Sequence, residues 1–426
     1  MTSWRSRSWQ PVVVLFASLA LVAVACSGGV EPTTSTPAGE TTDTTQSGTD
    51  TTQGGTVSPS STSVSEATLQ ICMIGIMSGP AAFWGTALQS ALETAIEDSG
   101  ELVIGDTRYT IEPIIYDDEY SAQKAVDAAN RLITRDEVKF IVGPIGSDSV
   151  LAVQPLIEEQ GIFLLADSLS PDVVNPDAPL TFRMNLSTLE YSGGFYQWVA
   201  ENLTEVESVV LIGPNDAAGQ GVSEPGAEGA SAAGLDAHLE YYERGTQDFT
   251  SLAARVMSLA PDAVDLAGSA PGDAATLAFQ LRQAGFEGRF FKTGGSSLAQ
   301  ILDQLGEEAT KGFVFFSDVD FSADQVASYA DRIESEYGVG LVSLTPWWHD
   351  SIMWLIEAMR SSQSLDPDTV AQELRNMATF EGPLVGPLHW GGQDTYGINQ
   401  QLIGPFFVME WTGSESVVRA QLVANG

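Results

Sequence analysis

VKFIVGP (Val138–Pro144) and SVVLIGP (Ser208–Pro214) are two short apolar runs that each end in Gly-Pro, and each leads into a polar loop and a helical pattern. Short runs rich in β-branched residues, with amphipathic helical patterns between them, are typical of parallel strands covered by helices on both faces. After the second run, the same order of polar loop and helical pattern begins again. The sequence therefore predicts an α/β protein made of two doubly wound parallel-sheet lobes, each with its ligand-facing loops at the carboxyl ends of its strands.

The same alternation extends outward from both runs. Before the first run, the apolar segment Leu69–Met77 is followed by Leu88, Leu92 and Ile96, whose spacing is typical of one helix face. After the second run, the segment AVDLAGSAP (Ala263–Pro271) precedes another helical pattern. Strand and helix thus alternate through the whole body, which favours right-handed crossovers within each lobe.

The C-terminal patterns indicate a return to the first lobe followed by a last crossing into the second. Several crossing strands would form a hinge, and a ligand bound between the lobes would drive its closure. We therefore predict a first lobe of residues 66–187 and 321–398, a second lobe of residues 188–320 and 399–426, and crossings near 185–192, 317–321 and 397–401.

The N-terminus has the features of a processing and targeting signal. Arg5 and Arg7 precede the apolar run Pro11–Ala25, and Cys26 follows at once. The run resembles a bacterial lipobox, with Ala23 where Leu is most common, so residues 1–25 are predicted to be a lipoprotein signal peptide and Cys26 to be acylated. An ordinary secretory signal with a chance cysteine is the alternative.

Residues 26–65 are rich in Thr, Ser, Gly and Pro and nearly free of apolar side chains. Such a composition predicts a disordered tether, because it cannot bury enough surface to offset its ordering entropy. With the signal and Cys26, the tether predicts an extracytoplasmic protein anchored by lipid to the outer face of the bacterial cell membrane.

The amino-acid composition limits the kinds of binding partner that are expected. The formal net charge of −38 disfavours nucleic acid and anionic lipid surfaces, which select clustered basic residues. Beyond Cys26 the chain has one cysteine, Cys72, which lies in a predicted strand and is interpreted as a core residue. The three histidines are widely spaced, and no nucleotide-binding or hydrolase motif occurs, so we predict no cofactor, no metal and no enzymatic activity. A monomer is expected.

The ordered series of motifs resembles one family, the type I periplasmic binding proteins, and within it the substrate-binding lipoproteins of branched-chain amino acid (Leu/Ile/Val) ABC transporters. Each motif is weak alone, but their order and spacing from Leu69 onward identify the family. The motifs are IGIMSGPAAFWG (Ile74–Gly85), YDDEYSAQKAVDAANRLI (Tyr116–Ile133), FIVGPIGSDS (Phe140–Ser149), GIFLLADSLSP (Gly161–Pro171), TFRMN (Thr181–Asn185), DFTSLAARV (Asp248–Val256), LRQAGF (Leu281–Phe286), KGFVFF (Lys311–Phe316) and VGPLHW (Val385–Trp390).

The resemblance implies a set of ligand contacts in the first lobe. The loop that contains Ser147, Asp148 and Ser149 matches the family's loop at a helix start, where a Ser hydroxyl and backbone N–H groups receive the ligand's carboxylate. Ser168 and Ser170 match the positions that offer a carbonyl and a hydroxyl to an amino acid's head group. These serines also suit simple N-capping roles.

The second lobe departs from the family pattern. An aromatic is absent from the loop at Asp216 and from Ser269, and Gly294 stands where an acidic residue often receives the ligand's ammonium. A buried ammonium without a carboxylate partner is costly. Either Asp167, Asp148 or Asp216 supplies the acid from another direction, or the ligand carries no ammonium.

Aromatic side chains complete the predicted site. Phe83 and Trp84 occupy the family's aromatic position in the first loop and are expected to line the cleft, whereas Trp347 and Trp348 are expected in the core. The predicted function is capture of a small molecule, an amino acid or other small carboxylate or amide, and its delivery to the permease and ATPase subunits of an ABC importer. The alternatives are a ligand-sensing receptor domain that signals through a partner and a serine hydrolase built on Ser147.

Overall fold

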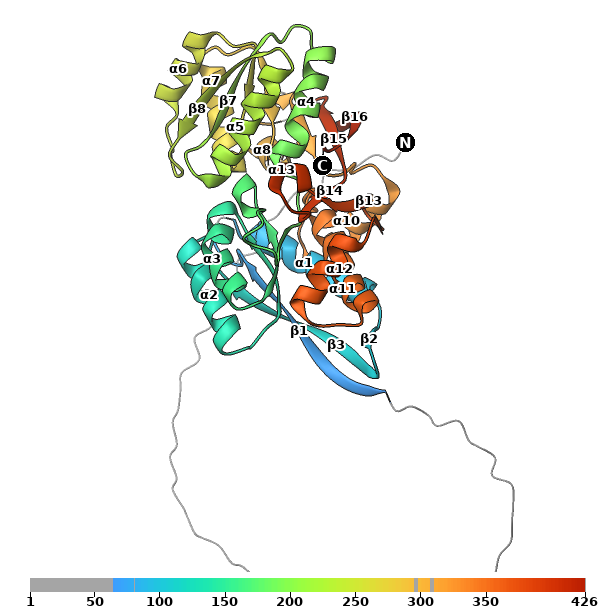
Figure 1. The fold of residues 1–426 in the computed structure, drawn as a ribbon. Coiled ribbons are helices and arrows are strands. Elements are labelled where there is room, and N and C mark those ends of the chain that lie inside the picture. Colours follow the sequence, from blue (N-terminus) through green and yellow to red (C-terminus); the bar gives the residue numbers. More distant parts are fainter. Residues whose placement is uncertain (1–63, 80, 295–297, 307–309, 426) are drawn as a thin grey trace, which may run out of the picture. The chain divides into compact units, whose positions relative to one another are not determined.

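The structure is a computed structural model that describes residues 64–79, 81–294, 298–306 and 310–425. It contains two separate sheets (Figure 1). We call the elements of the nine-stranded sheet and the helices packed on it lobe 1, and those of the seven-stranded sheet lobe 2. Within the described residues, no helix is both long enough and apolar enough to cross a membrane.

The nine-stranded sheet has the order β12-β13-β14-β6-β5-β4-β1-β3-β2. Its inner strands run parallel, and the antiparallel strands β2, β12 and β13 lie toward its edges. The strands are β1 (Ser65–Gly75), β2 (Leu102–Ile104), β3 (Thr107–Asp117), β4 (Phe140–Ile145), β5 (Phe163–Asp167), β6 (Thr181–Arg183), β12 (Phe380–Gly382), β13 (Gly386–Gly391) and β14 (Gln401–Ile403).

Helices cover both faces of this sheet, as the sequence predicts for a doubly wound lobe (Figure 1). One face is covered by α2 and α3, and α1, α11 and α12 lie on the other. The helices of lobe 1 are α1 (Ala82–Asp98), α2 (Ala122–Thr134), α3 (Ser147–Glu159), the short 3-10 helix η1 (Pro171–Val173), α10 (Asp324–Tyr337), α11 (Thr345–Ser362), α12 (Pro367–Asn376) and α13 (Gln393–Tyr396).

The seven-stranded sheet has the order β16-β15-β11-β10-β9-β7-β8, in which β7 to β11 are parallel and β15 and β16 antiparallel. Helices α4 and α5 pack on one face, and α6, α7 and α8 on the other. The elements of lobe 2 are α4 (Thr188–Asn202), β7 (Ser208–Pro214), α5 (Ala217–Ala232), β8 (Asp236–Tyr242), α6 (Thr250–Leu259), β9 (Ala263–Asp265), α7 (Pro271–Gln283), β10 (Arg289–Lys292), α8 (Leu298–Leu305), β11 (Val314–Ser317), β15 (Pro405–Trp411) and β16 (Ser416–Val423).

The chain passes between the sheets three times, so the predicted hinge of several strands is present. The first passage follows β6 and the second follows β11, both where the sequence places them. The third lies at Gly404, between β14 and β15, a few residues after the predicted 397–401. Strand β14 pairs with β6, which explains the delay, because the chain adds one more strand to the first sheet before it leaves. The residue boundaries of the lobes remain a prediction.

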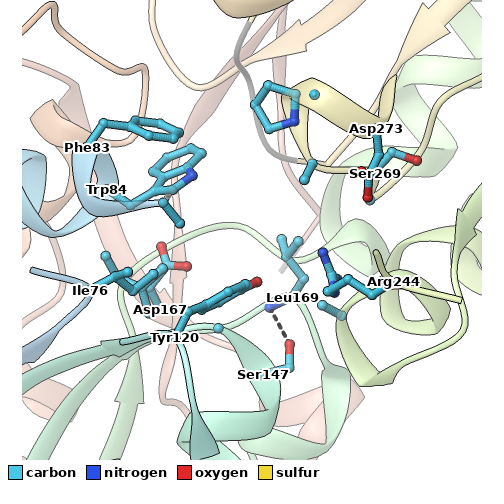
Figure 2. A pocket seen from close by; sticks show the side chains of 18 of the residues that line it. Ile76, Phe83, Trp84, Tyr120, Ser147, Asp167, Leu169, Arg244, Ser269 and Asp273 are labelled. Atoms are coloured by element: carbon cyan, nitrogen blue, oxygen red, sulfur yellow. Dashed lines mark hydrogen bonds between the residues drawn. The ribbon is translucent and has the colours of Figure 1, made fainter. Parts of the chain in front are cut away.

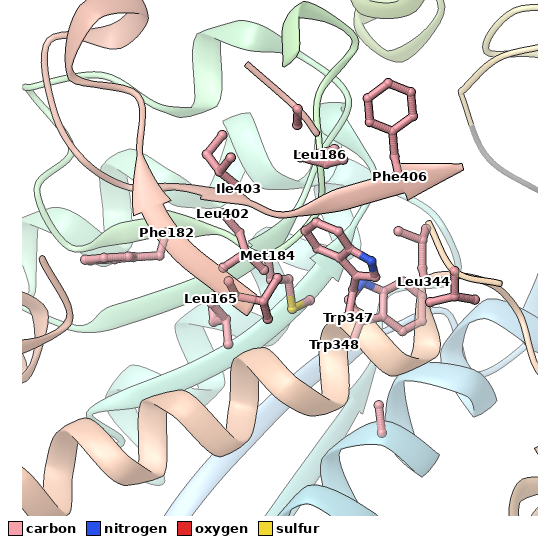
Figure 3. Packing of buried hydrophobic residues seen from close by; sticks show 14 of the residues in the cluster. Leu165, Phe182, Met184, Leu186, Leu344, Trp347, Trp348, Leu402, Ile403 and Phe406 are labelled. Carbon is pink, nitrogen blue, oxygen red and sulfur yellow. The ribbon is translucent and has the colours of Figure 1, made fainter. Parts of the chain in front are cut away.

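The two tryptophans at the start of α11 lie in the core, as predicted. Trp347 and Trp348 are fully buried among apolar residues from both sheets, including Leu165 of β5 and Phe406 of β15 (Figure 3). Cys72 is also buried, and its burial raises the pKa of the thiol to about 12, as expected for an inert core residue. The predicted signal peptide, Cys26 and nearly all of the tether lie outside the described residues; β1 begins at Ser65.

Candidate ligand-binding site

A cavity of about 780 Å³ lies between residues of both lobes (Figure 2). Lobe 1 contributes the aromatic side chains and most of the larger apolar side chains that line the cavity. Lobe 2 contributes mainly small residues. The cavity lies where the carboxyl ends of the parallel strands meet, as expected for a doubly wound fold. Its lining is Ile76, Ser78, Ala81, Phe83, Trp84, Glu119, Tyr120, Ile145, Gly146, Ser147, Asp167, Leu169, Ala218, Arg244, Gly245, Gly268, Ser269, Ala270, Pro271, Gly272, Asp273, Gly294 and Leu344.

Ser147 is the first residue of α3, at the N-terminal end of that helix. Its Oγ accepts the backbone N–H of Leu169 at 3.2 Å (Figure 2). It also accepts the backbone N–H of Ser170 at 3.0 Å and the Ser168 hydroxyl at 3.2 Å. No acceptor for the Ser147 hydroxyl hydrogen occurs among the described residues, so this hydrogen can donate to another group. The helix start adds unpaired N–H groups and a positive partial charge, so this end of the cavity suits an anion.

Asp167, the last residue of β5, supplies a carboxylate to the cavity. Its side chain is only 5 % exposed, and Oδ2 accepts the indole N–H of Trp348 at 2.8 Å. Within the described part of the chain, Oδ1 has no hydrogen-bond partner and is not sealed from the cavity. Burial raises the pKa of Asp167 to about 6, and the hydrogen bond from Trp348 opposes that rise. The cavity thus contains a buried carboxylate that would interact favourably with a cation or a hydrogen-bond donor on a ligand.

Two aromatic rings form an apolar wall on lobe 1. Phe83 and Trp84, both at the start of α1, line the cavity with ring centroids 4.9 Å apart. Trp84 rests edge-on against Trp348, with centroids 6.2 Å apart, so the wall is fixed to the core. A rigid aromatic wall beside a few oriented polar groups is the usual composition of a small-molecule site.

Lobe 2 presents a smoother wall. Ala218, Gly268, Ser269 and Gly294 line it, and the Ser269 hydroxyl donates to the carbonyl of Ile212 at 3.2 Å. Gly294 has φ +66°, and a Cβ there would lie 2.7 Å from the side chain of Val222, so this position cannot simply carry the acidic residue that is common in the family. In the described lining of the cavity, lobe 2 thus contributes no aromatic side chain.

The other predicted site residues lie around the cavity. Asp148 is exposed, and Ser149 is buried beneath the lining. The Ser168 carbonyl, expected to face the ligand, accepts the side-chain N–H of Asn185 at 3.1 Å. The Ser170 hydroxyl caps η1. Ser168 and Ser170 are thus placed to orient Ser147 rather than to line the cavity.

Sequence reasoning missed several lining residues. Tyr120 and Glu119 follow β3, and their place at the carboxyl end of a predicted strand is the signal that would have found them. Arg244 and Asp273 come from lobe 2. Arg244 follows β8, a half-exposed edge strand that is difficult to recognise in the sequence because it contains several polar residues.

The described lining contains no histidine and no cysteine. No cluster of three potential metal ligands occurs among the described residues. The groups that contact the Ser147 Oγ are backbone amides and another serine, none of which is a general base, so the geometry gives the hydrolase alternative no support.

Two sheets with a cavity between them, and a helix start inside that cavity, are features of a binding protein with two lobes. A model of the family described as periplasmic binding protein matches residues 68–416. The chain belongs to this family. The type I periplasmic binding fold predicted from the motifs is confirmed by solved structures with the same architecture, such as a leucine-binding protein from Thermotoga maritima with a TM-score of 0.72, which is 21% identical and covers 83% of this chain and 98% of its own.

Named relatives of this periplasmic binding protein are amino acid binders. A leucine-, isoleucine-, valine-, threonine- and alanine-binding protein from Pseudomonas aeruginosa is 25% identical over 75% of this chain and 85% of its own length. A leucine-specific-binding protein from Salmonella typhimurium is 24% identical over 82% of this chain and 93% of its own. A solute-binding protein from R. palustris, solved in complex with benzoate, has a TM-score of 0.71 and 18% identity over 84% of this chain and 98% of its own.

Proposed function

We propose that this protein captures a small carboxylate outside the cytoplasmic membrane by closing two lobes over it, and that the closed form delivers the ligand to the permease and ATPase subunits of an ABC importer. The single observation that carries this proposal is the Ser147 hydroxyl, which lines the cavity at the start of α3 and for whose hydrogen the described residues offer no acceptor. A carboxylate at that point would receive a hydroxyl and backbone N–H groups together.

We further propose that the ligand is an amino acid whose ammonium is bound by Asp167. The acid that the family often has at the position of Gly294 is missing, but Asp167 brings a carboxylate from lobe 1. Its open Oδ1 and its burial make it a strong partner for a cation, because a buried carboxylate gains most from a charged group that it contacts directly. The names of the relatives, which are leucine and branched-chain amino acid binders, support the same ligand class.

An aromatic carboxylate is a second candidate, favoured by the ring pair of Phe83 and Trp84. Such a ligand has no ammonium, and Asp167 would then bind it in the protonated form. A solved structure with the same fold holds benzoate. The two candidates differ in the ammonium and in the apolar group, so a comparison of amino acids with benzoate separates them.

The N-terminal features extend the proposal to location. Cys26 would carry the lipid, and residues 26–65 would hold the binding domain away from the membrane as a flexible tether. We propose that the protein acts as a monomer in this anchored form. Labelling with a radioactive fatty acid tests the anchor: Cys26→Ser should abolish incorporation, and labelling that persists in this variant would contradict it.

The ligand proposal is tested by thermal-shift measurements with L-leucine, L-isoleucine, L-valine, benzoate and their amides. A ligand at about 1,000 times its dissociation constant adds about 4 kcal/mol to the free energy of unfolding and raises the melting temperature by several degrees. Stabilisation by the amino acids but not by benzoate supports Asp167 as the ammonium acceptor. Stabilisation by benzoate alone supports the second candidate, and no effect of any carboxylate would contradict the proposal.

A further inference from the structure

Arg244 is the only basic residue in the described lining of the cavity. It faces a site that also contains the carboxylates of Glu119, Asp167 and Asp273. In a chain with 56 acidic and 18 basic residues, such a site would repel an anionic ligand unless a cation offsets the acids. Arg244 is the lining residue that can do so.

Asp216 orients the Arg244 side chain. The Asp216 carboxylate caps α5 by accepting the Gly219 N–H at 2.9 Å, and its Oδ2 accepts Nε of Arg244 at 2.6 Å. Nη2 of Arg244 lies 2.6 Å from the same oxygen. Within the described part of the chain no polar group pairs with Nη1, so one edge of the guanidinium is bound to lobe 2 and the other is available for a ligand.

Tyr120 of lobe 1 contacts the same guanidinium. The Arg244 guanidinium carbon lies 5.9 Å from the centroid of the Tyr120 ring, within the range of a cation–π contact. The backbone of Tyr120 has a left-handed φ of 58°, and its N–H donates to the Asp118 carboxylate at 2.9 Å. The ring of Tyr120 is therefore held in place by a fixed turn.

The same ring marks where Arg244 reaches lobe 1. A Cβ on Gly146, the residue before Ser147, would lie 2.7 Å from a ring carbon of Tyr120. The ring therefore covers the residue before α3, and the Arg244 side chain beside it lies near the anion end of the cavity (Figure 2). Two elements far apart in sequence, one from each lobe, thus meet at the Ser147 helix start.

We propose that Arg244 is the lobe 2 half of the carboxylate site and that Tyr120 is its positioning residue. Ser147 and the α3 start bind the acid group from lobe 1, and the free edge of the Arg244 guanidinium binds it from lobe 2. The acid group itself therefore links the two lobes and favours the closed state, in addition to the contact between Tyr120 and Arg244. This inference rests on the proposed function for the ligand class, whereas the contact between Tyr120 and Arg244 involves protein groups alone.

The first experiment compares acids with their amides. L-leucine, benzoate, L-leucinamide and benzamide are titrated calorimetrically into the wild type and into Arg244→Gln, with dissociation rates from stopped-flow fluorescence. Loss of one charge-assisted hydrogen bond should weaken the acid that binds by about 10- to 100-fold, mostly through faster dissociation. Binding of the amide should change by less than about three-fold, because an amide brings no charge to the guanidinium.

Arg255→Gln is the matched control, because Arg255 of α6 pairs with Glu240 at 2.9 Å outside the cavity and its loss should leave both ligand types unchanged. Tyr120→Leu should weaken the acid about 3- to 10-fold. If Tyr120 acts by positioning Arg244, the double variant should bind no more weakly than Arg244→Gln alone. An equal loss for acid and amide, or an unchanged acid affinity in Arg244→Gln, overturns the inference.

A second experiment needs no ligand. Spin labels at Asn130→Cys on α2 and Ala254→Cys on α6, in the full chain carrying Cys26→Ser, report the distance between the lobes; the buried Cys72 would not be labelled. Arg244→Gln and Tyr120→Leu should both shift the distribution to longer distances. If none of the four probes binds the wild type, the proposed function fails for these ligands, and an unchanged distribution in both variants overturns the positioning of Arg244 as well.

Discussion

The two walls of the cavity are built on opposite plans. Lobe 1 supplies aromatic rings, the Ser147 hydroxyl and the Asp167 carboxylate, each held by bonds to buried neighbours. Lobe 2 supplies mostly alanine, glycine and serine, with Arg244 and Asp273 as its charged groups. This difference indicates that the two lobes have different roles. Lobe 1 is organised to bind a ligand, whereas lobe 2 has few groups that could bind it alone.

The division has a physical consequence for closure. A ligand shifts a population toward the closed state only by interacting better with that state than with the open one. A lobe of small side chains offers few contacts that depend on ligand shape, so the differential interaction has to come from its charged groups. We therefore expect affinity to be sensitive to substitutions across the lobe 1 wall and, in lobe 2, mainly to those at Arg244.

The largest effect is expected from Asp167→Asn. If an ammonium binds there, loss of its charged partner should weaken L-leucine by about 3 kcal/mol in calorimetric titration. The same variant should melt at a higher temperature without ligand at pH 7, because burial raises the pKa of Asp167 to about 6 and the ionised form is therefore disfavoured in the folded state. The exposed Asp148→Asn is the control, and unchanged leucine affinity in Asp167→Asn would remove Asp167 from the site.

A matched pair of serines compares the walls directly. Ser147→Ala should weaken the bound carboxylate by about 1–3 kcal/mol, because a ligand oxygen loses its donor. Ser269→Ala should change ligand affinity by less than about 0.5 kcal/mol, since its hydroxyl already donates to the carbonyl of Ile212. Isothermal titration of both variants measures the difference, and equal losses would show that lobe 2 takes part in binding as strongly as lobe 1.

The pH dependence of stability should reflect three buried carboxyl groups. Burial raises the pKa of Asp118 to about 6, of Asp167 to about 6 and of Asp318 to about 7. Oδ2 of Asp118 and Oδ1 of Asp318 are buried without a partner in the described chain.

Because the folded-state pKa values of these three carboxyls lie above the ordinary value of 3.8, the folded state binds more protons than the unfolded state between about pH 4 and 7. These three groups should therefore stabilise the free protein by about 3 kcal/mol as pH falls from 7.5 to 5.5. His389, with its pKa lowered by burial, opposes this gain. Denaturant unfolding at several pH values tests it: Asp318→Asn should flatten the slope, and stability that falls over this range would contradict the assignment.

The smallest effect is expected from adding bulk to lobe 2. Ala270→Leu should shift selectivity between L-valine and L-tryptophan toward valine by about 1 kcal/mol, because the added methyl groups occupy space that only a large ligand uses. Ala254→Leu, at an exposed position of α6 outside the cavity lining, is the control for added bulk. Competition binding measures the ratio of the two affinities, and an unchanged ratio would indicate that the ligand does not reach this wall.

Much of the fold was accessible from the sequence, because strand and helix patterns repeat with clear periods. The two-lobe fold, the crossings after β6 and β11, and the buried Cys72, Trp347 and Trp348 followed from apolar pattern or motif match. The third crossing was placed too early. β14 is a short strand whose pairing with β6 depends on a partner distant in sequence, which no local pattern records.

The site was accessible only in part. Of the predicted binding residues, Ser147, Asp167, Phe83, Trp84, Ser269 and Gly294 line the cavity, whereas Asp148, Ser149, Ser168, Ser170 and Asp216 lie outside its lining. Motif match places a residue near a loop end, but the direction of its side chain depends on neighbours such as Asn185, which holds the Ser168 backbone. Arg244 was missed because its strand, β8, is half-exposed and polar.

The class of this protein can be read from its sequence, because the order of apolar strands, amphipathic helices and loop motifs is local information that each segment carries. The arrangement of charges in the cleft depends on the folded structure. Tyr120, Ser147 and Arg244 are separated along the chain and belong to different lobes, and their meeting at the start of α3 results from two sheets packed through a shared core. Electrostatic and hydrogen-bond energies depend on such distances, which the order of residues does not contain.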